Sequence, residues 1–204
     1  MSLPDRSTFE SAYAGQPPWE IGRPQRAFLE VADQIRGSLL DSGCGTGETA
    51  LYFASRGHRV TGIDFLAEPI RRAREKAAER GLDVTFLVHD ALRLSELNAV
   101  FDTVLDSGLF HVFSDDDRSR YVEGLATVLR PGGWFYLLCF SDEEPGTQGP
   151  RRVSRPEIEA AFAKDWTIGS ITPTRFEVRP DLTDITFSPG GPKAWFAVIR
   201  RDGQ

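Results

Sequence analysis

The sequence is poor in the residues that build disulfide frameworks and metal sites. Its 204 residues include only two cysteines, Cys44 and Cys139, and three histidines. The cysteines lie far apart, and neither belongs to a CxxC pair or a His-rich stretch, so the pattern predicts neither a disulfide framework nor a zinc site. Such cysteine usage is typical of a reducing compartment, and we expect a cytoplasmic protein without a bound metal.

Long apolar runs and an excess of positive charge are also missing. No stretch approaches the roughly 18 continuous apolar residues of a membrane span, and the N-terminal segment lacks the apolar centre of a secretory signal. The formal net charge is -6, which disfavours nucleic acid as a ligand because its phosphates are bound mainly by clustered Lys and Arg. We therefore expect a small-molecule substrate and neither a membrane nor a nucleic acid as a partner.

Short apolar runs alternate with helical patterns along most of the chain. Helical spacing of apolar residues between the second and third runs, and again at 155–162, predicts helices that connect parallel strands in an α/β fold. Five of the apolar runs predict strands, at residues 38–42, 59–64, 84–89, 101–107 and 133–141.

The last third of the chain has a different pattern. Two longer stretches, 165–178 and 194–201, predict strands that a loop joins into an antiparallel hairpin at one edge of the sheet. A chain of 204 residues with 40% hydrophobic content suits one sizeable core. We expect a single domain over 1–204, in which an N-terminal arm, 1–24, precedes the α/β core, 25–204.

Three glycines at alternate positions, Gly43, Gly45 and Gly47, follow the first predicted strand. Glycines between a strand and a helix let the backbone approach a ligand closely, and the helix N-terminus offers unpaired N–H groups. The G-x-G-x-G spacing differs from the dinucleotide pattern G-x-G-x-x-G, and no Gly-Lys-Ser/Thr follows, which excludes a P-loop. Asp64 ends the next strand, 21 positions after Gly43, where a carboxylate can accept hydrogen bonds from both ribose hydroxyls.

A second carboxylate, Asp41, precedes the first glycine by two residues. This position beside the loop suits a ligand with a positively charged amino group better than one with a pyrophosphate. S-adenosylmethionine carries such an amino group together with a ribose, an adenine and a sulfonium. The residues therefore favour this molecule as the cofactor, with S-adenosylhomocysteine as its product.

The stretch "LLDSGCGTGE" at 39–48, with Asp64, "HDA" at 89–91 and "LRPGG" at 129–133, resembles the class I S-adenosylmethionine-dependent methyltransferases. These motifs stand in the order of that family. The resemblance implies a Rossmann-like, mostly parallel sheet of seven strands with helices on both faces. It also implies that the cofactor lies across the carboxyl ends of the first four strands. With or without this resemblance, "LRPGG" is predicted to end a helix and turn into the fifth strand.

The resemblance also implies roles for single positions. The three glycines would cradle the methionine part of the cofactor, Asp64 the ribose, and Asp90 with Ala91 the adenine edge, on which Phe65 packs. An alternative for Asp90 is that it caps the short helix that follows it, and we expect Cys44 to be a small side chain in a crowded loop. The expected cofactor contacts are Trp19, Asp41, Gly43, Cys44, Gly45, Thr46, Gly47, Asp64, Phe65, Asp90, Ala91, Asp106 and Ser107.

Methyl transfer is an in-line displacement on an activated sulfonium, so the protein mainly positions the nucleophile and excludes water. The segment 106–117 follows the fourth strand and emerges beside the sulfonium. Its histidine, His111, is the candidate catalytic residue, as a general base near neutral pH; the alternative is a buried packing residue. The acidic run 115–117 is predicted to begin a helix that Ser114 caps, and not to bind a metal.

Two other segments are candidate walls of a substrate site. The arm is rich in aromatic residues and prolines and lies ahead of the first predicted helix. The loop 141–152 is long, rich in Gly and Pro, and ends in two arginines. Either arginine of that loop can hold an anionic or oxygen-rich substrate. The expected substrate contacts are Tyr13, Trp19, Ile21, His111, Arg151 and Arg152.

The W-x-x-G of the arm, from Trp19 to Gly22, and the G-P turn after the fifth strand resemble the thiopurine, thiol and halide methyltransferase branch and related bacterial enzymes that methylate hydroxyquinolones. The resemblance implies an arm that covers the cofactor and a hydrophobic pocket for an S, O or N nucleophile of a small heteroaromatic or thiol substrate. The chain departs from the thiopurine enzymes in the two arginines after "GP" and in its shorter length, which leaves the acceptor open.

Two other function classes stay in view. A nucleotide-dependent oxidoreductase on a Rossmann fold is favoured by Gly43 and Asp64 but disfavoured by the glycine spacing and Asp41. The other is a protein that binds the cofactor without catalysis. We expect a monomer or a weak homodimer in each case.

Overall fold

The computed structural model describes residues 6–181 and 186–203. The first five residues of the predicted arm and residues 182–185 of the loop between the last two predicted strands lie outside the described residues. The strands are β1 (Leu39–Ser42), β2 (Val60–Asp64), β3 (Thr85–Val88), β4 (Phe101–Ser107), β5 (Leu129–Phe140), β6 (Trp166–Arg175) and β7 (Lys193–Arg201). The helices are α1 (Arg6–Ala14), α2 (Arg26–Glu30), α3 (Glu48–Ser55), α4 (Ala67–Glu79), α5 (Asp115–Val128) and α6 (Arg155–Ala161), with short 3₁₀ helices η1 (Ala91–Leu97) and η2 (Phe110–Val112).

The seven strands form one sheet in the order β3-β2-β1-β4-β5-β7-β6. The first five are parallel, whereas β7 pairs antiparallel with both β5 and β6. The predicted mostly parallel sheet with an antiparallel hairpin at one edge is therefore confirmed. The chain runs outward from β1 to β3 on one side and from β4 onward on the other, and in such sheets ligands bind at the carboxyl ends of the strands beside this reversal.

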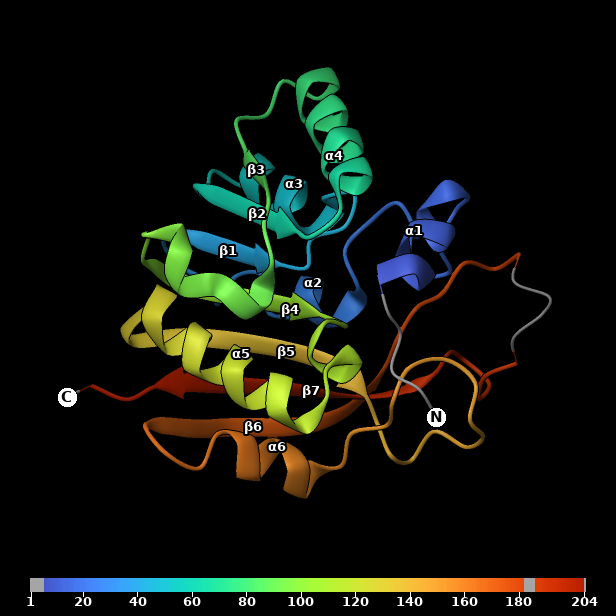
Figure 1. Cartoon of the computed structure of the whole chain (residues 1–204), viewed down its shortest axis with the longest axis vertical. Coiled ribbons are helices and arrows are strands. Elements are labelled where there is room, and N and C mark those ends of the chain that lie inside the picture. Colours follow the sequence, from blue (N-terminus) through green and yellow to red (C-terminus); the bar gives the residue numbers. More distant parts are fainter. Residues whose placement is uncertain (1–5, 182–185, 204) are drawn as a thin grey trace.

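Helices cover both faces of the sheet, as the sequence predicted (Figure 1). Alternate residues of each strand point to opposite faces: Leu40 and Val104 join the cluster beneath η1, α5 and α6, while Leu39 and Leu105 join the cluster beneath α2, α3 and α4. Because both faces are buried, the parallel strands read as nearly continuous apolar runs.

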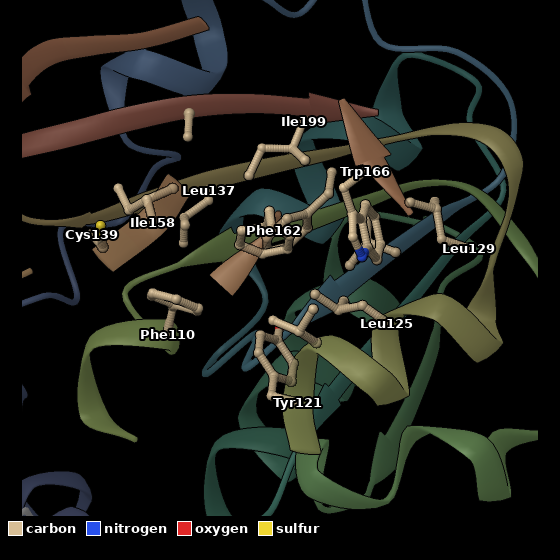
Figure 2. Close-up of a cluster of buried hydrophobic side chains, with 14 of the residues drawn as sticks. Phe110, Tyr121, Leu125, Leu129, Leu137, Cys139, Ile158, Phe162, Trp166 and Ile199 are labelled. Atoms are coloured by element: carbon tan, nitrogen blue, oxygen red, sulfur yellow. The ribbon is translucent and has the colours of Figure 1, made fainter. Parts of the chain in front are cut away.

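Aromatic rings fasten α5 and α6 to the sheet (Figure 2). The Phe162 ring, just after α6, has its centroid 5.6 Å from that of Phe135 on β5 and 5.4 Å from that of Trp166 on β6. Full burial of one such side chain stabilises the fold by about 1.5–3 kcal/mol. This packing fixes the edge strands relative to the central strands that end at the site.

Two local predictions differ from the structure. "LRPGG", at 129–133, was expected as a turn before the fifth strand, and that boundary is wrong: β5 begins at Leu129, with a register shift after its first pair. The shift arises where a Cβ on Gly133 would come within 2.9 Å of the backbone of Asp102. The helix α1 within the arm was not predicted. Within the described residues, no helix is long and apolar enough to cross a membrane.

Candidate active site

A cavity of about 1350 Å³ opens at the carboxyl ends of the central strands. Its walls include the glycine loop after β1, the segments after β2, β3 and β4, the arm, and the loop 146–152. In Figure 1 the helix α1 lies beyond the carboxyl ends of β1 and β4, on the side of that loop. Cavities for a single small molecule commonly measure about 300–1,000 Å³, so this one has room for a cofactor and a second small molecule.

The glycine loop is a left-handed turn with little free space above it. Gly43, Gly45 and Gly47 have φ angles of +72°, +53° and +85°, which L side chains rarely adopt. A Cβ on Gly43 would lie 3.2 Å from Leu109, and one on Gly45 would lie 2.7 Å from the Tyr13 hydroxyl. Both of these glycines line the cavity.

Gly47 faces away from the cavity lining. Its Cβ would lie 2.7 Å from the Phe86 ring of β3 and 3.0 Å from Ala73 of α4. The lack of a side chain here lets α4 and β3 pack closely beneath the start of α3. The structure thus gives Gly47 a packing role, and the predicted contact with the cofactor stays a prediction.

Three buried carboxylates lie at the ends of adjacent strands. Asp41 Oδ2 accepts a hydrogen bond from the Ala50 amide at 3.0 Å, and Asp106 accepts one from the Leu109 amide at 2.7 Å. Asp64 accepts from the Gly45 amide at 3.2 Å and from the Leu66 amide at 2.9 Å.

Burial governs the protonation of these groups. It raises the pKa of Asp41 to about 7, with a smaller contribution from the charges of Asp106 and Asp64. Burial likewise raises the pKa of Asp64 to about 6 and that of Asp106 to about 7. Within the described part of the chain, none of the three forms an ion pair with Lys or Arg. Concentrated, unpaired negative charge at a site makes it attractive to a cation.

These features fit S-adenosylmethionine, the cofactor expected from the sequence. Gly43 and Gly45 present bare backbone to the cavity, where the methionine part would lie, and Asp41 and Asp64 both line the same cavity. The cofactor's ammonium and sulfonium would supply the positive charge that the buried carboxylates lack. Asp106 does not line the cavity; its carboxylate is used by backbone amides at the start of η2.

The predicted adenine residues, Phe65, Asp90 and Ala91, all line the cavity. Asp90 caps η1, because its Oδ1 accepts from the Leu92 amide at 2.9 Å, so the alternative role considered for it is present in the structure. The Phe65 ring meets the Phe9 ring of α1 edge-on, with 5.7 Å between their centroids. Adenine contact by these residues stays a prediction.

The arm lies over the glycine loop. Tyr13 of α1 is buried, and its hydroxyl accepts a hydrogen bond from the Trp19 indole N–H at 3.2 Å. Burial, followed by the nearby Asp64 carboxylate, raises the pKa of the Tyr13 hydroxyl. Tyr13, Trp19 and Ile21 line the cavity together with Cys44 and Thr46 of the loop.

Sequence analysis missed Glu20, which ties the arm to the loop. Its Oε1 accepts from the Thr46 hydroxyl at 2.8 Å and lies 3.4 Å from Lys76 Nζ. Its Oε2 is buried without a hydrogen bond from any described residue and lies 4.0 Å from Arg72 Nη1. A single acidic residue in an arm has no spacing that signals such contacts.

His111 of η2 lines the far part of the cavity, only 6% exposed. The Phe140 amide donates a hydrogen bond to its Nδ1 at 3.0 Å. The rings of Phe140 and Phe176 flank it at centroid distances of 5.2 and 5.8 Å. Burial, and then the positive charges of Arg118 and Arg152, lower the pKa of His111 to about 3. The ring is therefore neutral at physiological pH, and the packing alternative is present in the structure.

The two predicted substrate arginines line the cavity but are engaged elsewhere. Arg151 pairs with Asp115 and Glu157, each at 2.7 Å. Arg152 donates to the carbonyls of Pro150 at 2.7 Å and Gln148 at 2.9 Å, with its guanidinium over the Phe140 ring. These contacts hold the loop 144–152 in shape, and substrate binding by either arginine stays a prediction.

Ser107 also lines the cavity at the end of β4. The acidic run after it begins α5, whose Ser114 accepts from the Asp117 amide at 3.0 Å, so the predicted helix start is confirmed. Among the residues that the structure describes, no cluster of three or more His, Cys, Asp or Glu side chains is arranged to hold a metal.

The chain is similar in sequence and in fold to known proteins. A family model described as a methyltransferase domain matches residues 39–133. The 2-heptyl-1-hydroxyquinolin-4(1H)-one methyltransferase of Mycobacteroides abscessus is 37% identical, over 95% of this chain and 89% of that protein. A structure solved for the conversion of a disulfide bond into a thioacetal group during echinomycin biosynthesis is 35% identical, with a TM-score of 0.84 over 97% of this chain and 93% of that chain. The 1,6-didemethyltoxoflavin-N1-methyltransferase of Burkholderia thailandensis, with bound 1,6-didemethyltoxoflavin and S-adenosylhomocysteine, is 25% identical, with a TM-score of 0.70 over 97% of this chain and 87% of that chain.

Proposed function

This chain belongs to the S-adenosylmethionine-dependent methyltransferases, and we propose that it methylates an oxygen, sulfur or nitrogen nucleophile on a small heteroaromatic or thiol substrate. The class of enzyme and its cofactor, predicted from the motifs, are confirmed by the relatives. They favour this activity over the nucleotide-dependent oxidoreductase and over a protein without catalysis.

The observation that carries the proposed substrate class is the aromatic end of the cavity. Beyond the glycine loop its walls include the rings of Phe113, His111, Phe140, Phe176 and Phe187. Flat aromatic surfaces of this kind pack well against a planar ring system. The relatives named for a hydroxyquinolone and for 1,6-didemethyltoxoflavin both carry the name of a planar heterocycle, which supports a planar ring system as the substrate and leaves the nucleophilic atom open.

The residues of this chain would bind the cofactor, orient the acceptor and shield both from water. When bound, the cofactor supplies an electrophilic methyl group on its sulfonium. Asp41 would pair with the ammonium, Asp64 would accept from the ribose hydroxyls, and Phe65 with Ala91 would contact the adenine. The arm, with Tyr13 and Trp19, would cover this end and limit the access of water to the bound cofactor.

A binding assay followed by a transfer assay tests this function. Calorimetry with S-adenosylhomocysteine should show binding, and mass spectrometry should detect methylation of hydroxyquinolines, hydroxyquinolones or heteroaryl thiols. The panel includes aliphatic thiols and phosphatidylethanolamine, and Asp64→Ala protein is the negative control. Transfer to phosphatidylethanolamine alone would contradict the proposed substrate class, and transfer to aliphatic thiols alone would assign the thiol part of it.

We propose a single domain over 1–204 that consists of an N-terminal arm, 1–24, and a core, 25–204, and that acts in the cytoplasm as a monomer or weak homodimer without nucleic acid as a partner. The free thiols of Cys44 and Cys139 and the net charge of -6 support this placement. A hydrogen bond between the arm and the core supports a single domain, because Arg179, after β6, donates to the Gln16 carbonyl at 2.8 Å.

A further inference from the structure

The tautomer of His111 is fixed by its hydrogen bond to the backbone of β5. The Phe140 amide donates to Nδ1 at 3.0 Å. A backbone N–H can only donate, so Nδ1 must present its lone pair, and a neutral imidazole then carries its single proton on Nε2. Nε2 is therefore a hydrogen-bond donor and has no free lone pair with which to take up a proton.

The surroundings of the ring favour this neutral form. The groups packed against it are uncharged: Phe140 of β5, Phe176 after β6, and Gly108, where a Cβ would lie 3.4 Å from Nε2. The charged groups that act on it are both positive, Arg118 of α5 and Arg152 after β5, and they lower its pKa together with burial. Protonation of Nδ1 would place a second proton against the Phe140 amide hydrogen and leave that buried amide without an acceptor.

The ring lines the cavity, and no described residue forms a hydrogen bond with Nε2. We infer that His111 is a positioning residue that donates a hydrogen bond from Nε2 to an acceptor atom of the substrate, and that the substrate is a heteroaromatic hydroxyl or thiol that binds as its anion. The inference rests on the proposed function and assigns to its acceptor site a narrower chemistry.

Among the described residues that line this end of the cavity, Asp117 is the other candidate for a base. Asp117 lines the cavity, but its carboxylate accepts from the Ser114 hydroxyl at 2.8 Å and from Arg120 at 3.1 Å. Arg118 pairs with Glu157 at 3.1 Å, whereas Arg152 lines the cavity and forms no ion pair with a carboxylate of the described residues, so its positive charge lowers the energy of a bound anion. An acidic hydroxyl or thiol conjugated with a ring carbonyl or ring nitrogen supplies both the anion and the acceptor for Nε2–H.

The reaction then needs no proton transfer to the protein. The proton of the substrate leaves to solvent before binding. The ionised oxygen or sulfur forms a bond to the methyl carbon while the bond from that carbon to the sulfonium breaks, and the electron pair of the broken bond stays on sulfur. The products are the neutral methylated heterocycle and S-adenosylhomocysteine.

A pH series tests the inference. With hydroxyquinolones and heteroaryl thiols of graded acidity, the inflection in kcat/KM should follow the pKa of each substrate. His111→Phe keeps a packing ring and removes the donor, so it should raise KM about tenfold with kcat and the inflection nearly unchanged, a loss of one hydrogen bond. His111→Gln retains a donor and should recover most of the loss. An inflection at one pH for all substrates that disappears in His111→Phe would identify a general base and overturn the inference.

The tautomer has a readout that does not depend on activity. In ¹⁵N-labelled full-length protein, His111 should give a protonated Nε2 and an unprotonated Nδ1, assigned by loss of the signal in His111→Gln; a protonated Nδ1 overturns the inference. Calorimetry with S-adenosylhomocysteine shows whether each variant is folded, and if His111→Phe is not, the substrate series and the NMR spectrum decide. Failure of the proposed function would look different, because wild-type protein would bind the cofactor and methylate no heteroaromatic acceptor.

Discussion

The indole N–H of Trp19 donates a hydrogen bond to the Tyr13 hydroxyl across 3.2 Å, and that hydroxyl rests on the glycine loop. The arm therefore touches the backbone that is expected to hold the methionine part of the cofactor. Any change in the shape of this loop should be felt by the arm, and loss of the arm should expose the loop to water.

Replacing Gly45 by alanine is expected to weaken binding of S-adenosylhomocysteine by at least about tenfold. Its φ of +53° costs an L residue about 1–2 kcal/mol, and the new methyl group would lie 2.7 Å from the Tyr13 hydroxyl. Calorimetry measures the affinity. The control is Gly15→Ala, also in the arm region, whose Cβ comes no nearer than 3.8 Å to another atom. Equal affinities of the two variants would count against a close approach of the arm to the loop.

Replacing Asp64 by alanine is expected to weaken cofactor binding by at least about a hundredfold. The ribose hydroxyls would lose a charged acceptor worth about 1.5–3 kcal/mol for each hydrogen bond, and the Gly45 and Leu66 amides would lose theirs. Asp64→Asn keeps one acceptor oxygen, and its affinity for the cofactor should lie between those of wild type and Asp64→Ala. Asp116→Asn, an exposed aspartate of α5, is the matched control. Wild-type affinity in Asp64→Ala would reject the placement of the ribose.

The sequence was sufficient for the frame of this site. Parallel strands buried on both faces read as apolar runs, and the residues at their carboxyl ends meet at one edge of the sheet whatever the details of packing. Asp41 and Asp64 could therefore be placed beside the glycine loop from their positions alone, and both line the cavity. Gly47 belongs to the same motif as Gly43 and Gly45 but faces Phe86. Its orientation depends on how α4 packs on β3, which the motif does not specify.

The rest of the site depends on contacts between distant parts of the chain. His111 could be singled out from the sequence, but its tautomer is decided by Phe140, 29 residues away. Glu20 reaches Thr46 across 26 residues, and the guanidinium of Arg118, buried on α5, bonds Glu157 across 39 residues. None of these pairs has a periodicity, because each depends on how a loop or arm folds back over the sheet.

The buried carboxylate of Asp41 should make the stability of the ligand-free protein depend on pH. Its pKa rises to about 7 on folding, so the folded state holds more protons than the unfolded state between about pH 4 and 7. This group therefore lowers the free energy of unfolding as pH rises through that window, by up to about 1.4 kcal/mol per pH unit. His111, with its lowered pKa, acts in the opposite direction, so the comparison must be made between variants.

Asp41→Asn is accordingly expected to stabilise the ligand-free protein more at pH 8 than at pH 5, as measured by urea unfolding. With saturating S-adenosylhomocysteine at pH 8, wild type should instead be more stable than Asp41→Asn, since the ammonium of the ligand pairs with the wild-type carboxylate and not with the amide. A difference between wild type and variant that does not change with pH would indicate that Asp41 is ionised in the folded protein throughout.

Glu20 should control how fast the cofactor leaves. Glu20→Ala removes the acceptor of the Thr46 hydroxyl and one of the two carboxylate partners of Lys76, which also pairs with Glu48 at 2.9 Å, so the arm should open more often and the dissociation rate of S-adenosylhomocysteine should rise about tenfold. Stopped-flow tryptophan fluorescence reports the rate, and Trp19→Phe identifies the contribution of Trp19 among the four tryptophans. Glu10→Ala, which breaks only the exposed pair with Arg6 in α1, should leave it unchanged. Equal rates in both variants would show that Glu20 does not hold the arm.

Arg152 and Arg151 allow a test of whether the basic loop binds the substrate or shapes its pocket. If Arg152 acts by holding the Pro150 and Gln148 carbonyls, Arg152→Ala should raise KM about tenfold for neutral acceptors and by more for anionic ones, which also lose the attraction of its positive charge, and should speed limited proteolysis between residues 144 and 150. Arg152→Lys should not restore KM, because an ammonium cannot reproduce the planar fork of a guanidinium. Arg151→Ala, which frees Asp115 and Glu157 at the start of two helices, should have a smaller effect. A loss confined to anionic acceptors and rescued by lysine would instead identify direct charge recognition, and the loop would then bind the substrate as the sequence predicted.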